Sequence, residues 1–161
     1  MTRAVLSIGS NLGDRMANLR IAADGFTGVL CVASPVYETA PWGVEDQPDF
    51  LNAVLIVDDP GTDEWGWLRR GQALERAAGR VRDRHWGPRS LDVDVVTVDG
   101  VTSEHPELRL PHPGTPDRAT VLIPWLDVQP DAVLPGHGPV RDLLARLDTS
   151  GVHRRADLGL S

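Results

Sequence analysis

Clusters of apolar positions divide the chain into short elements that are separated by glycine and proline. Stretches rich in β-branched residues, in which polar and apolar positions alternate, are typical of strands. Such stretches predict strands over Arg3–Ile8, Val29–Tyr37, Leu51–Asp58 and Leu91–Val98. Asp99–Gly100 follows the last of them directly and is a hairpin turn signal, which predicts one more strand beyond it.

Apolar residues spaced three and four apart predict the helices. The predicted helices cover Asp14–Ala23, Asp63–Ala78, Arg118–Leu126 (ending near Pro124 or Pro130) and a segment after Pro139. In the second helix, a stripe with the spacing of one buried face is formed by Trp67, Gly71, Leu74 and Ala78. Gln72 and Glu75 project together from a different face, and for these two residues alone a solvated surface is the default interpretation.

These elements predict the fold class. Two strand–helix–strand units with hairpin strands between them indicate an α+β sandwich, in which helices pack on a mostly antiparallel sheet. The segment Glu38–Phe50 holds two prolines, a glycine and four carboxylates, so we expect an exposed loop there. A length of 161 residues suits one domain over residues 1–161. The stretch 149–161 lacks periodicity and is a candidate for a disordered tail.

Composition narrows the function. The net charge is −7, which argues against a broad basic face for nucleic acid or for an anionic membrane. All 16 basic residues are Arg, which excludes a P-loop and Schiff-base chemistry because both need a lysine. Cys31 is the single cysteine, so internal disulfides and thiolate zinc clusters are excluded. The apolar stretch Ala4–Ile8 is too short for a signal peptide, and we expect a cytoplasmic protein.

Asp92 and Asp94 carry the sharpest chemical signal. On a strand their side chains point to the same face, while Leu91, Val93 and Val95 point to the other. Two adjacent carboxylates repel each other unless a cation lies between them, and Mg²⁺ takes such oxygen ligands while it keeps positions open for phosphate. The alternative is an ordinary strand with one solvated polar face.

An arginine-rich stretch lies just before this strand. It contains four arginines within ten residues, namely Arg80, Arg82, Arg84 and Arg89, and also Trp86. Guanidinium groups bind phosphate oxygens in bidentate fashion, and carboxylates close by would hold a bridging metal. The alternative is that these arginines only balance acidic groups on the surface, but their place beside the presumed metal site favours phosphate binding.

The chain resembles a known family over most of its length. The segment His85–Val96 (HWGPRSLDVDVV) is similar to the signature of 6-hydroxymethyl-7,8-dihydropterin pyrophosphokinases of folate biosynthesis. Further matching segments are Gly9–Gly13, Tyr37–Thr39, Gln47–Asn52, Glu75, Gly79–Arg80, Leu110–Pro113 and Arg118. The resemblance implies a ferredoxin-like fold. It also implies a reaction in which the hydroxymethyl oxygen of the pterin attacks the β-phosphorus of ATP and AMP leaves.

The resemblance assigns roles to the residues above. It implies that Asp92 and Asp94 hold two Mg²⁺ ions, one that bridges the ATP phosphates and one that joins the β-phosphate to the attacking oxygen. Arg80 and Arg89 correspond to the family's catalytic arginines, which neutralise charge on the transferred group. The implied ATP contacts are Gln72, Glu75, Arg80, Arg82, Trp86, Arg89, His112 and Arg118.

The implied pterin contacts suit a flat heterocycle, which needs an aromatic face and amide groups along its edge. They are Thr39, Pro41, Trp42, Phe50 and Asn52. Without the motif, Phe50 could equally be a core residue at the start of a strand. Where family members usually place a second aromatic residue against the pterin, this chain has Thr120.

Two other functions compete with the pyrophosphokinase interpretation. One is a nucleotide- or pterin-binding module with weak or lost turnover, which Thr120 favours and the retained aspartates and arginines oppose. The other is an RNA-binding ferredoxin-like domain, which the few aromatic residues and the negative charge oppose. We therefore expect an enzyme that acts on ATP and hydroxymethyl dihydropterin as a monomer, with neither nucleic acid nor a membrane as partner.

Overall fold

The computed structural model describes residues 3–39, 48–79 and 90–160. Its elements in chain order are β1 (Arg3–Ser10), α1 (Arg15–Asp24), β2 (Leu30–Ala33), β3 (Tyr37–Thr39), β4 (Phe50–Asp58), α2 (Glu64–Ala77), β5 (Asp92–Val98), β6 (Ser103–His105), β7 (Leu108–Leu110), the 3₁₀ turn η1 (Thr115–Asp117), α3 (Ala119–Val128), β8 (Val133–Leu134), β9 (Gly138–Pro139), α4 (Val140–Leu144) and β10 (Val152–Arg154).

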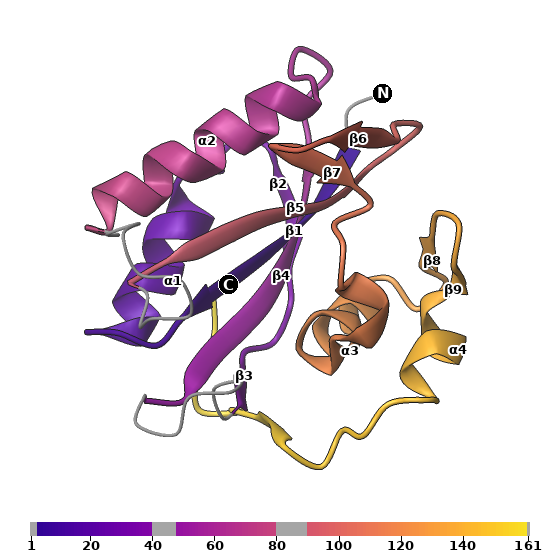
Figure 1. The fold of residues 1–161 in the computed structure, drawn as a ribbon. Helices are drawn as coiled ribbons and strands as arrows, with labels where there is room; N and C mark the ends of the chain where they lie inside the picture. The colour runs from indigo at the N-terminus through magenta and orange to yellow at the C-terminus, as the bar shows by residue number, and fades with distance from the viewer. Residues whose placement is uncertain (1–2, 40–47, 80–89, 161) are drawn as a thin grey trace.

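The main sheet has the strand order β10-β3-β4-β1-β5, and β2 also pairs with β4 (Figure 1). Every pairing in it is antiparallel. The long strands β1 and β4 form its centre, in a continuous register that runs from Arg3 opposite Asp58 to Ser10 opposite Leu51. The prediction of an α+β sandwich on a mostly antiparallel sheet is confirmed.

Helices cover both faces of this sheet. On one face, α1 and α2 pack over a cluster that includes Leu6, Leu19, Trp67 and Val93. On the other face, α3 and α4 pack over a smaller cluster built around Val54 and buried residues of both helices, among them Leu122, Trp125 and Val140. The period-two pattern of the strands divides their side chains between these two clusters. The same division decides where the polar residues of the strands emerge.

The helices α1 and α2 begin at the predicted places, each with a capping side chain. The Asp14 carboxylate accepts a hydrogen bond from the backbone N–H of Ala17 at 3.0 Å, and that of Asp63 accepts one from Gly66 at 2.7 Å. Within α2, Gly71 allows a close approach to β5, because a Cβ there would lie 2.9 Å from Cγ1 of Val93. The buried stripe of α2 therefore fits the helix tightly against the strand that carries the paired aspartates.

The predicted strand Val29–Tyr37 is in fact two strands. Between β2 and β3 the regular strand is interrupted at Ser34 and Pro35, and the Ser34 hydroxyl accepts the backbone N–H of Val54 at 2.8 Å. Proline supplies no N–H to a ladder, so the strand breaks there and its two parts pair with different lengths of β4. The predicted loop Glu38–Phe50 is also shorter than expected: Glu38 and Thr39 belong to β3, Phe50 begins β4, and residues 40–47 lie outside the described part.

Of the two ends predicted for α3, the one near Pro130 is confirmed, since the helix continues past Pro124 to Val128. Two further expectations differ from the structure. The predicted hairpin turn forms at Asp99–Gly100, with Val98 and Val101 bridged across it, but the strand β6 beyond it pairs with β7 and not with β5. The stretch from Thr149, a candidate for disorder, carries β10, which pairs with β3 at the edge of the sheet. No helix among the described residues is both long and apolar enough to span a membrane.

Candidate functional site

Strand register brings the predicted site residues to one face of the sheet. Residues directly opposite each other in an antiparallel pair point to the same face. Gly9 on β1 lies opposite Asn52 on one side and opposite Asp92 on the other. Thr39 lies opposite Phe50, two residues before Asn52. These residues therefore form a row across β3, β4, β1 and β5, on the face that α3 covers.

The β3–β4 part of this row is hydrogen-bonded and half-buried. Nδ2 of Asn52 donates to Oγ1 of Thr39 at 3.2 Å, and Thr39 is buried. Gly9 borders this part of the row: a Cβ at that position would lie 2.8 Å from Oδ1 of Asn52 and 3.8 Å from Cδ1 of Phe50. The glycine thus keeps open the space beside an amide and an aromatic ring. Pro41 and Trp42, the other implied pterin contacts, lie outside the described residues.

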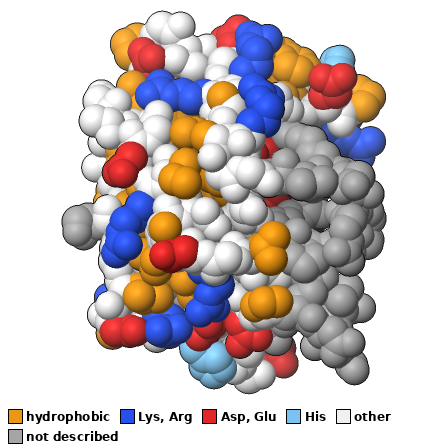
Figure 2. Space-filling model, turned by 90° about the vertical axis from the view of Figure 1, so that its left-hand side faces the viewer, with side chains coloured by type: hydrophobic (Ala, Val, Ile, Leu, Met, Phe, Trp, Pro, Cys, Tyr) orange, Lys and Arg blue, Asp and Glu red, His pale blue; other side chains and the backbone are white. Residues whose placement is uncertain are grey.

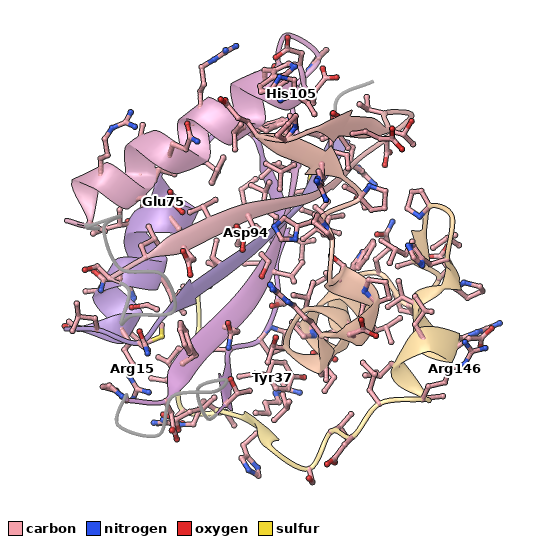
Figure 3. All side chains as sticks on the ribbon, in the orientation of Figure 1. Arg15, Tyr37, Glu75, Asp94, His105 and Arg146 are labelled. Atoms are coloured by element: carbon pink, nitrogen blue, oxygen red, sulfur yellow. The ribbon has the colours of Figure 1, made fainter. Side chains whose placement is uncertain are left out.

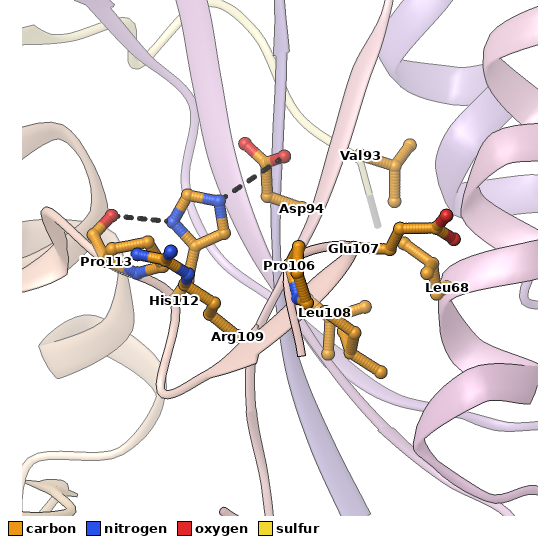
Figure 4. Close-up of a pocket in the computed structure, with 10 residues that line it drawn as sticks. Leu68, Val93, Asp94, Pro106, Glu107, Leu108, Arg109, His112 and Pro113 are labelled. Carbon is orange, nitrogen blue, oxygen red and sulfur yellow. Dashed lines mark hydrogen bonds and ion pairs between the residues drawn. The ribbon is translucent and has the colours of Figure 1, made fainter. Parts of the chain in front are cut away.

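The β5 part of the row is acidic and more open. Asp92 and Asp94 are half-exposed and Val93 between them is buried, so the alternation predicted for this strand is confirmed. Oδ1 of Asp94 lies 3.9 Å from Nε2 of His112. The ring of His112 is oriented by its Nδ1, whose N–H donates to the carbonyl of Pro113 at 2.8 Å (Figure 4). The backbone N–H of His112 also donates to the carbonyl of Val96 at 2.8 Å, which ties this loop to the edge of β5.

Asp94 and His112 share a cleft of about 350 Å³. Its remaining walls come from α2, β5, the hairpin β6–β7 and the loop after β7, and include Leu68, Glu107, Arg109 and Pro113 (Figure 4). Arg109 is the exposed middle residue of β7, between two buried leucines. The sequence analysis did not single out Arg109. The signal was present in the sequence: an arginine alternates with two leucines just before the Pro-His-Pro motif, which indicates a cation on the exposed face of a short strand. The structure therefore adds a guanidinium group to the acidic end of the site.

Glu75 and Gln72 do not share an environment. Glu75 is 2% exposed, and its Oε2 accepts the backbone N–H of Val93 at 2.9 Å, whereas Gln72 is half-buried. The default of a solvated face is therefore wrong for Glu75, because β5 lies at the edge of the sheet and presents an N–H that the helix can reach. In Figure 3, Glu75 projects from α2 toward β5, the strand that carries Asp94. Its carboxylate links α2 to the backbone between the two aspartates.

The other implied ATP contacts are not brought together in the described cleft. Neither Gln72, Glu75 nor Arg118 is among the residues that line it. Arg118 is exposed at the start of α3, with its Nε 3.4 Å from where a Cβ of Gly114 would lie. Four of the implied ATP contacts lie outside the described residues, namely Arg80, Arg82, Trp86 and Arg89. Thr120, the departure from the family pattern, is half-buried in the first turn of α3.

The two carboxylates on β5 suit Mg²⁺ that is shared with a substrate better than a metal ion that is held by protein ligands alone. Among residues 3–39, 48–79 and 90–160, no group of three or more His, Cys, Asp or Glu side chains could hold a metal. Mg²⁺ usually keeps several waters and binds through one or two carboxylates together with substrate phosphates. Asp92 and Asp94, on one face and open to solvent, supply that kind of incomplete oxygen site.

Basic and acidic side chains are mixed on one face of the molecule. On the face drawn in Figure 2, the arginine side chains are interspersed with acidic and apolar ones and form no continuous basic surface among the described residues. Phosphate-backbone recognition depends on such a surface.

Comparison with known proteins places these observations in a family. Residues 5–130 match the family model for 7,8-dihydro-6-hydroxymethylpterin-pyrophosphokinase. A Mycobacterium tuberculosis 2-amino-4-hydroxy-6-hydroxymethyldihydropteridine pyrophosphokinase is 53% identical over 160 residues, which cover 92% of this chain and 85% of the relative. The enzyme of the same name from Methylorubrum extorquens is 44% identical over 158 residues, which cover 96% of this chain and 99% of the relative.

A solved structure shares the fold. It is a crystal structure of Plasmodium falciparum HPPK-DHPS with pteroate, similar with a TM-score of 0.70 at 15% identity, over 90% of this chain and 42% of that chain. This chain spans less than half the length of that protein, and at this identity the likeness shows the fold alone, a ferredoxin-like sandwich. The family match and the two similar pyrophosphokinases show that the chain belongs to the 7,8-dihydro-6-hydroxymethylpterin-pyrophosphokinase family.

Proposed function

We propose that the protein transfers the pyrophosphoryl group of ATP to the hydroxymethyl oxygen of 6-hydroxymethyl-7,8-dihydropterin, with Mg²⁺, as a cytoplasmic monomer. Membership of the pyrophosphokinase family supports the reaction type and its place in folate biosynthesis. In this reaction the hydroxymethyl oxygen bonds to the β-phosphorus of ATP and the bond from that phosphorus to the α–β bridging oxygen breaks. AMP leaves with the bridging oxygen, and the hydroxyl proton passes to solvent.

The observation that carries the proposal is the row of residues on one sheet face. Asp92 and Asp94 stand at one end of it and Thr39, Phe50 and Asn52 at the other, with Gly9 between them. Two substrates bound at these two ends would meet over β1. Holding two reactants in the right geometry is a large part of what such a transfer requires of a protein.

At the acidic end, Asp92 and Asp94 would hold Mg²⁺. When bound there, the metal would neutralise phosphate charge and polarise the β-phosphoryl group. His112 has its ring fixed through the Pro113 carbonyl and presents Nε2 to the cleft, where it can contact the nucleotide. Arg109 lines the same cleft and can pair with a phosphate or stack on the base. Glu75 would act indirectly, by fixing the backbone at Val93 between the two carboxylates.

At the other end, Thr39, Phe50 and Asn52 would bind the pterin. The ring of Phe50 offers an aromatic face, and the Asn52 amide offers both a donor and an acceptor for the heterocycle's edge. The bond from Asn52 Nδ2 to Thr39 Oγ1 orients this amide, which leaves Oδ1 directed toward the space that Gly9 keeps open. The remaining contacts are proposed on family resemblance alone. Those to the pterin are Pro41 and Trp42. Those to ATP and its transferred group are Gln72, Arg80, Arg82, Trp86, Arg89 and Arg118.

The second candidate is a pterin- or nucleotide-binding module without turnover, which the threonine at position 120 favours. One incubation separates the two. With Mg²⁺, ATP and 6-hydroxymethyl-7,8-dihydropterin, we expect equal amounts of AMP and pterin diphosphate, measured by chromatography. Formation of ADP would indicate an ordinary kinase, and binding of both ligands without any nucleotide product would establish the binding module instead.

A further inference from the structure

The guanidinium group of Arg15 connects the two chain segments that flank residues 40–47. Its Nη1 donates both to Oε2 of Glu38 and to the backbone carbonyl of Asp49, the latter at 3.0 Å. Glu38 directly precedes Thr39, and Asp49 directly precedes Phe50. One nitrogen at the start of α1 thus fixes the positions from which two of the proposed pterin contacts project.

The second oxygen of Glu38 is held from the other side. Oε1 accepts a hydrogen bond from Nη1 of Arg155 at 3.0 Å, and Arg155 also donates from its backbone to the carbonyl of Val36 at 2.8 Å. Asp157 accepts from Nε and Nη2 of Arg155, at 3.0 and 2.8 Å, which fixes the plane of the guanidinium group. In addition, β10 pairs along the free edge of β3. A strand of only three residues is therefore held on both edges and by its central carboxylate.

These three side chains cannot touch a substrate that lies over the row of site residues. Successive side chains of a strand point to opposite faces, so Glu38 projects away from the face of Thr39 and toward α1. Its cross-strand partner Leu51 belongs to the core cluster under α1 and α2. Figure 3 shows Arg15 at the same end of the sheet as Tyr37, on β3, and away from Asp94. Any effect on a ligand must pass through the backbone of β3 and β4.

The contacts are charged and only partly exposed. The side chains of Arg15, Glu38 and Arg155 are 27%, 23% and 32% exposed. The hydrogen bond from Arg15 lowers the pKa of Glu38, with a smaller contribution from Arg155, so the carboxylate is ionised at neutral pH. Charge-assisted hydrogen bonds of this kind are stronger than neutral ones and restrict the geometry of both partners.

We infer that Arg15, Glu38 and Arg155 are positioning residues for the pterin end of the site, which together hold Thr39 and Phe50 at their places on the sheet. The inference rests on the proposed function, since it takes the β3–β4 end as the pterin subsite. It assigns a specific part in substrate binding to the segment 152–157, which lies far from Thr39 in the sequence. Because Asp94 and His112 stand at the other end of the row, the nucleotide should be nearly indifferent to these three side chains.

The test compares Arg15→Ala, Arg155→Ala and Glu38→Gln with two matched controls, Arg20→Ala on the exposed part of α1 and Arg146→Ala after α4. Calorimetric titration gives the affinities for the hydroxymethyl dihydropterin, with an unreactive ATP analogue and Mg²⁺ present, and for the analogue alone. We expect the pterin Kd and KM to rise roughly three- to tenfold in the three variants, with analogue affinity and kcat within about twofold of the parent. The controls should match the parent in every measurement.

The double variant Glu38→Gln/Arg155→Ala sharpens the test, because Arg155 reaches β3 by its side chain only through Glu38. Its pterin affinity should equal that of Glu38→Gln alone, and fully additive losses would contradict the assignment. The inference is overturned if the three variants bind pterin as the controls do, or if analogue and pterin affinities fall together. Thermal melts identify a variant that has merely lost its fold, and the mild Glu38→Gln change then decides. If the parent enzyme binds no pterin or forms no AMP, the proposed function fails and not the positioning role.

Discussion

The two ends of the proposed site share one face of one sheet but are built in different ways. Asp92 and Asp94 come from a single strand, and their common direction follows from the two-residue period of that strand. Thr39, Phe50 and Asn52 come from two strands, need a glycine on a third, and are held by contacts from α1 and β10. Substitutions at the acidic end should therefore lower the catalytic rate but leave the fold intact. At the other end, changes in the surrounding residues should displace the side chains that contact the ligand.

The largest effect is expected at the acidic end. Asp94→Asn removes a charge from a half-exposed side chain and leaves the buried neighbours Val93 and Val95 in place. The rate of pyrophosphoryl transfer should fall by about 10²-fold or more while the melting temperature changes little. Single-turnover kinetics at saturating Mg²⁺ measures this. Asp99→Asn, in the turn that follows the same strand, is the control, and a rate within about threefold of the parent for Asp94→Asn would contradict the assignment.

Gly9→Ala tests the packing of the other end. The new Cβ would lie 2.8 Å from Oδ1 of Asn52, so the amide has to move out of its present position. We expect pterin affinity to fall roughly tenfold, because a displaced hydrogen-bonding group loses its partner on the ligand. The affinity for an ATP analogue should stay near that of the parent. Gly159→Ala is the control, because beyond its two chain neighbours no residue comes within 4 Å of the new Cβ. Equal losses for both ligands would show that the change acts through general stability.

Arg109→Ala tests the nucleotide end from the side that the sequence did not reveal. Loss of one guanidinium group from the cleft should weaken binding of the ATP analogue roughly three- to tenfold, with pterin affinity unchanged. Calorimetry with each ligand separates the two effects. Arg146→Ala, an exposed arginine after α4, serves as a control of equal charge change. If both variants lose the same affinity, the effect comes from net charge and not from the cleft.

The smallest effect concerns stability and pH. The folded state lowers the pKa of Glu38 from its ordinary value of 4.5, so ionised Glu38 stabilises the fold above that pH, and this stabilisation is lost as the pH falls through the folded-state pKa. Glu38→Gln should therefore melt about 2–4 °C below the parent at neutral pH, a modest shift because the pairs are partly exposed. As the pH falls from 4.5 through the lowered folded-state pKa, the two melting temperatures should converge. A difference that stays constant from pH 7 to the acid side would mean that Glu38 stabilises the fold by packing alone.

Local chemistry was predictable from the residues themselves. Three features follow from short-range patterns and are confirmed by the structure. They are the common face of Asp92 and Asp94, the first turns of α1 and α2, and the combination of helices with an antiparallel sheet. A strand's period and a helix cap depend on atoms a few residues apart, so the sequence states them directly. The resemblance of the motifs to a family supplied the expected residue roles, and several of these residues fall in 40–47 and 80–89, outside the described part.

Other features depended on which segments pair across the fold. The pairing of β10 with β3 and the presence of Arg109 in the same cleft as Asp94 bring together parts of the chain that no local period relates. Glu75 is the clearest case: its helical spacing predicts a solvated carboxylate, but α2 packs so closely on β5 through Gly71 that the carboxylate reaches the N–H of Val93. The sequence by itself determined which chemical groups this protein offers and how each is oriented on its own element. Only tertiary structure decided which of them meet, because that depends on strand register and helix packing between distant residues.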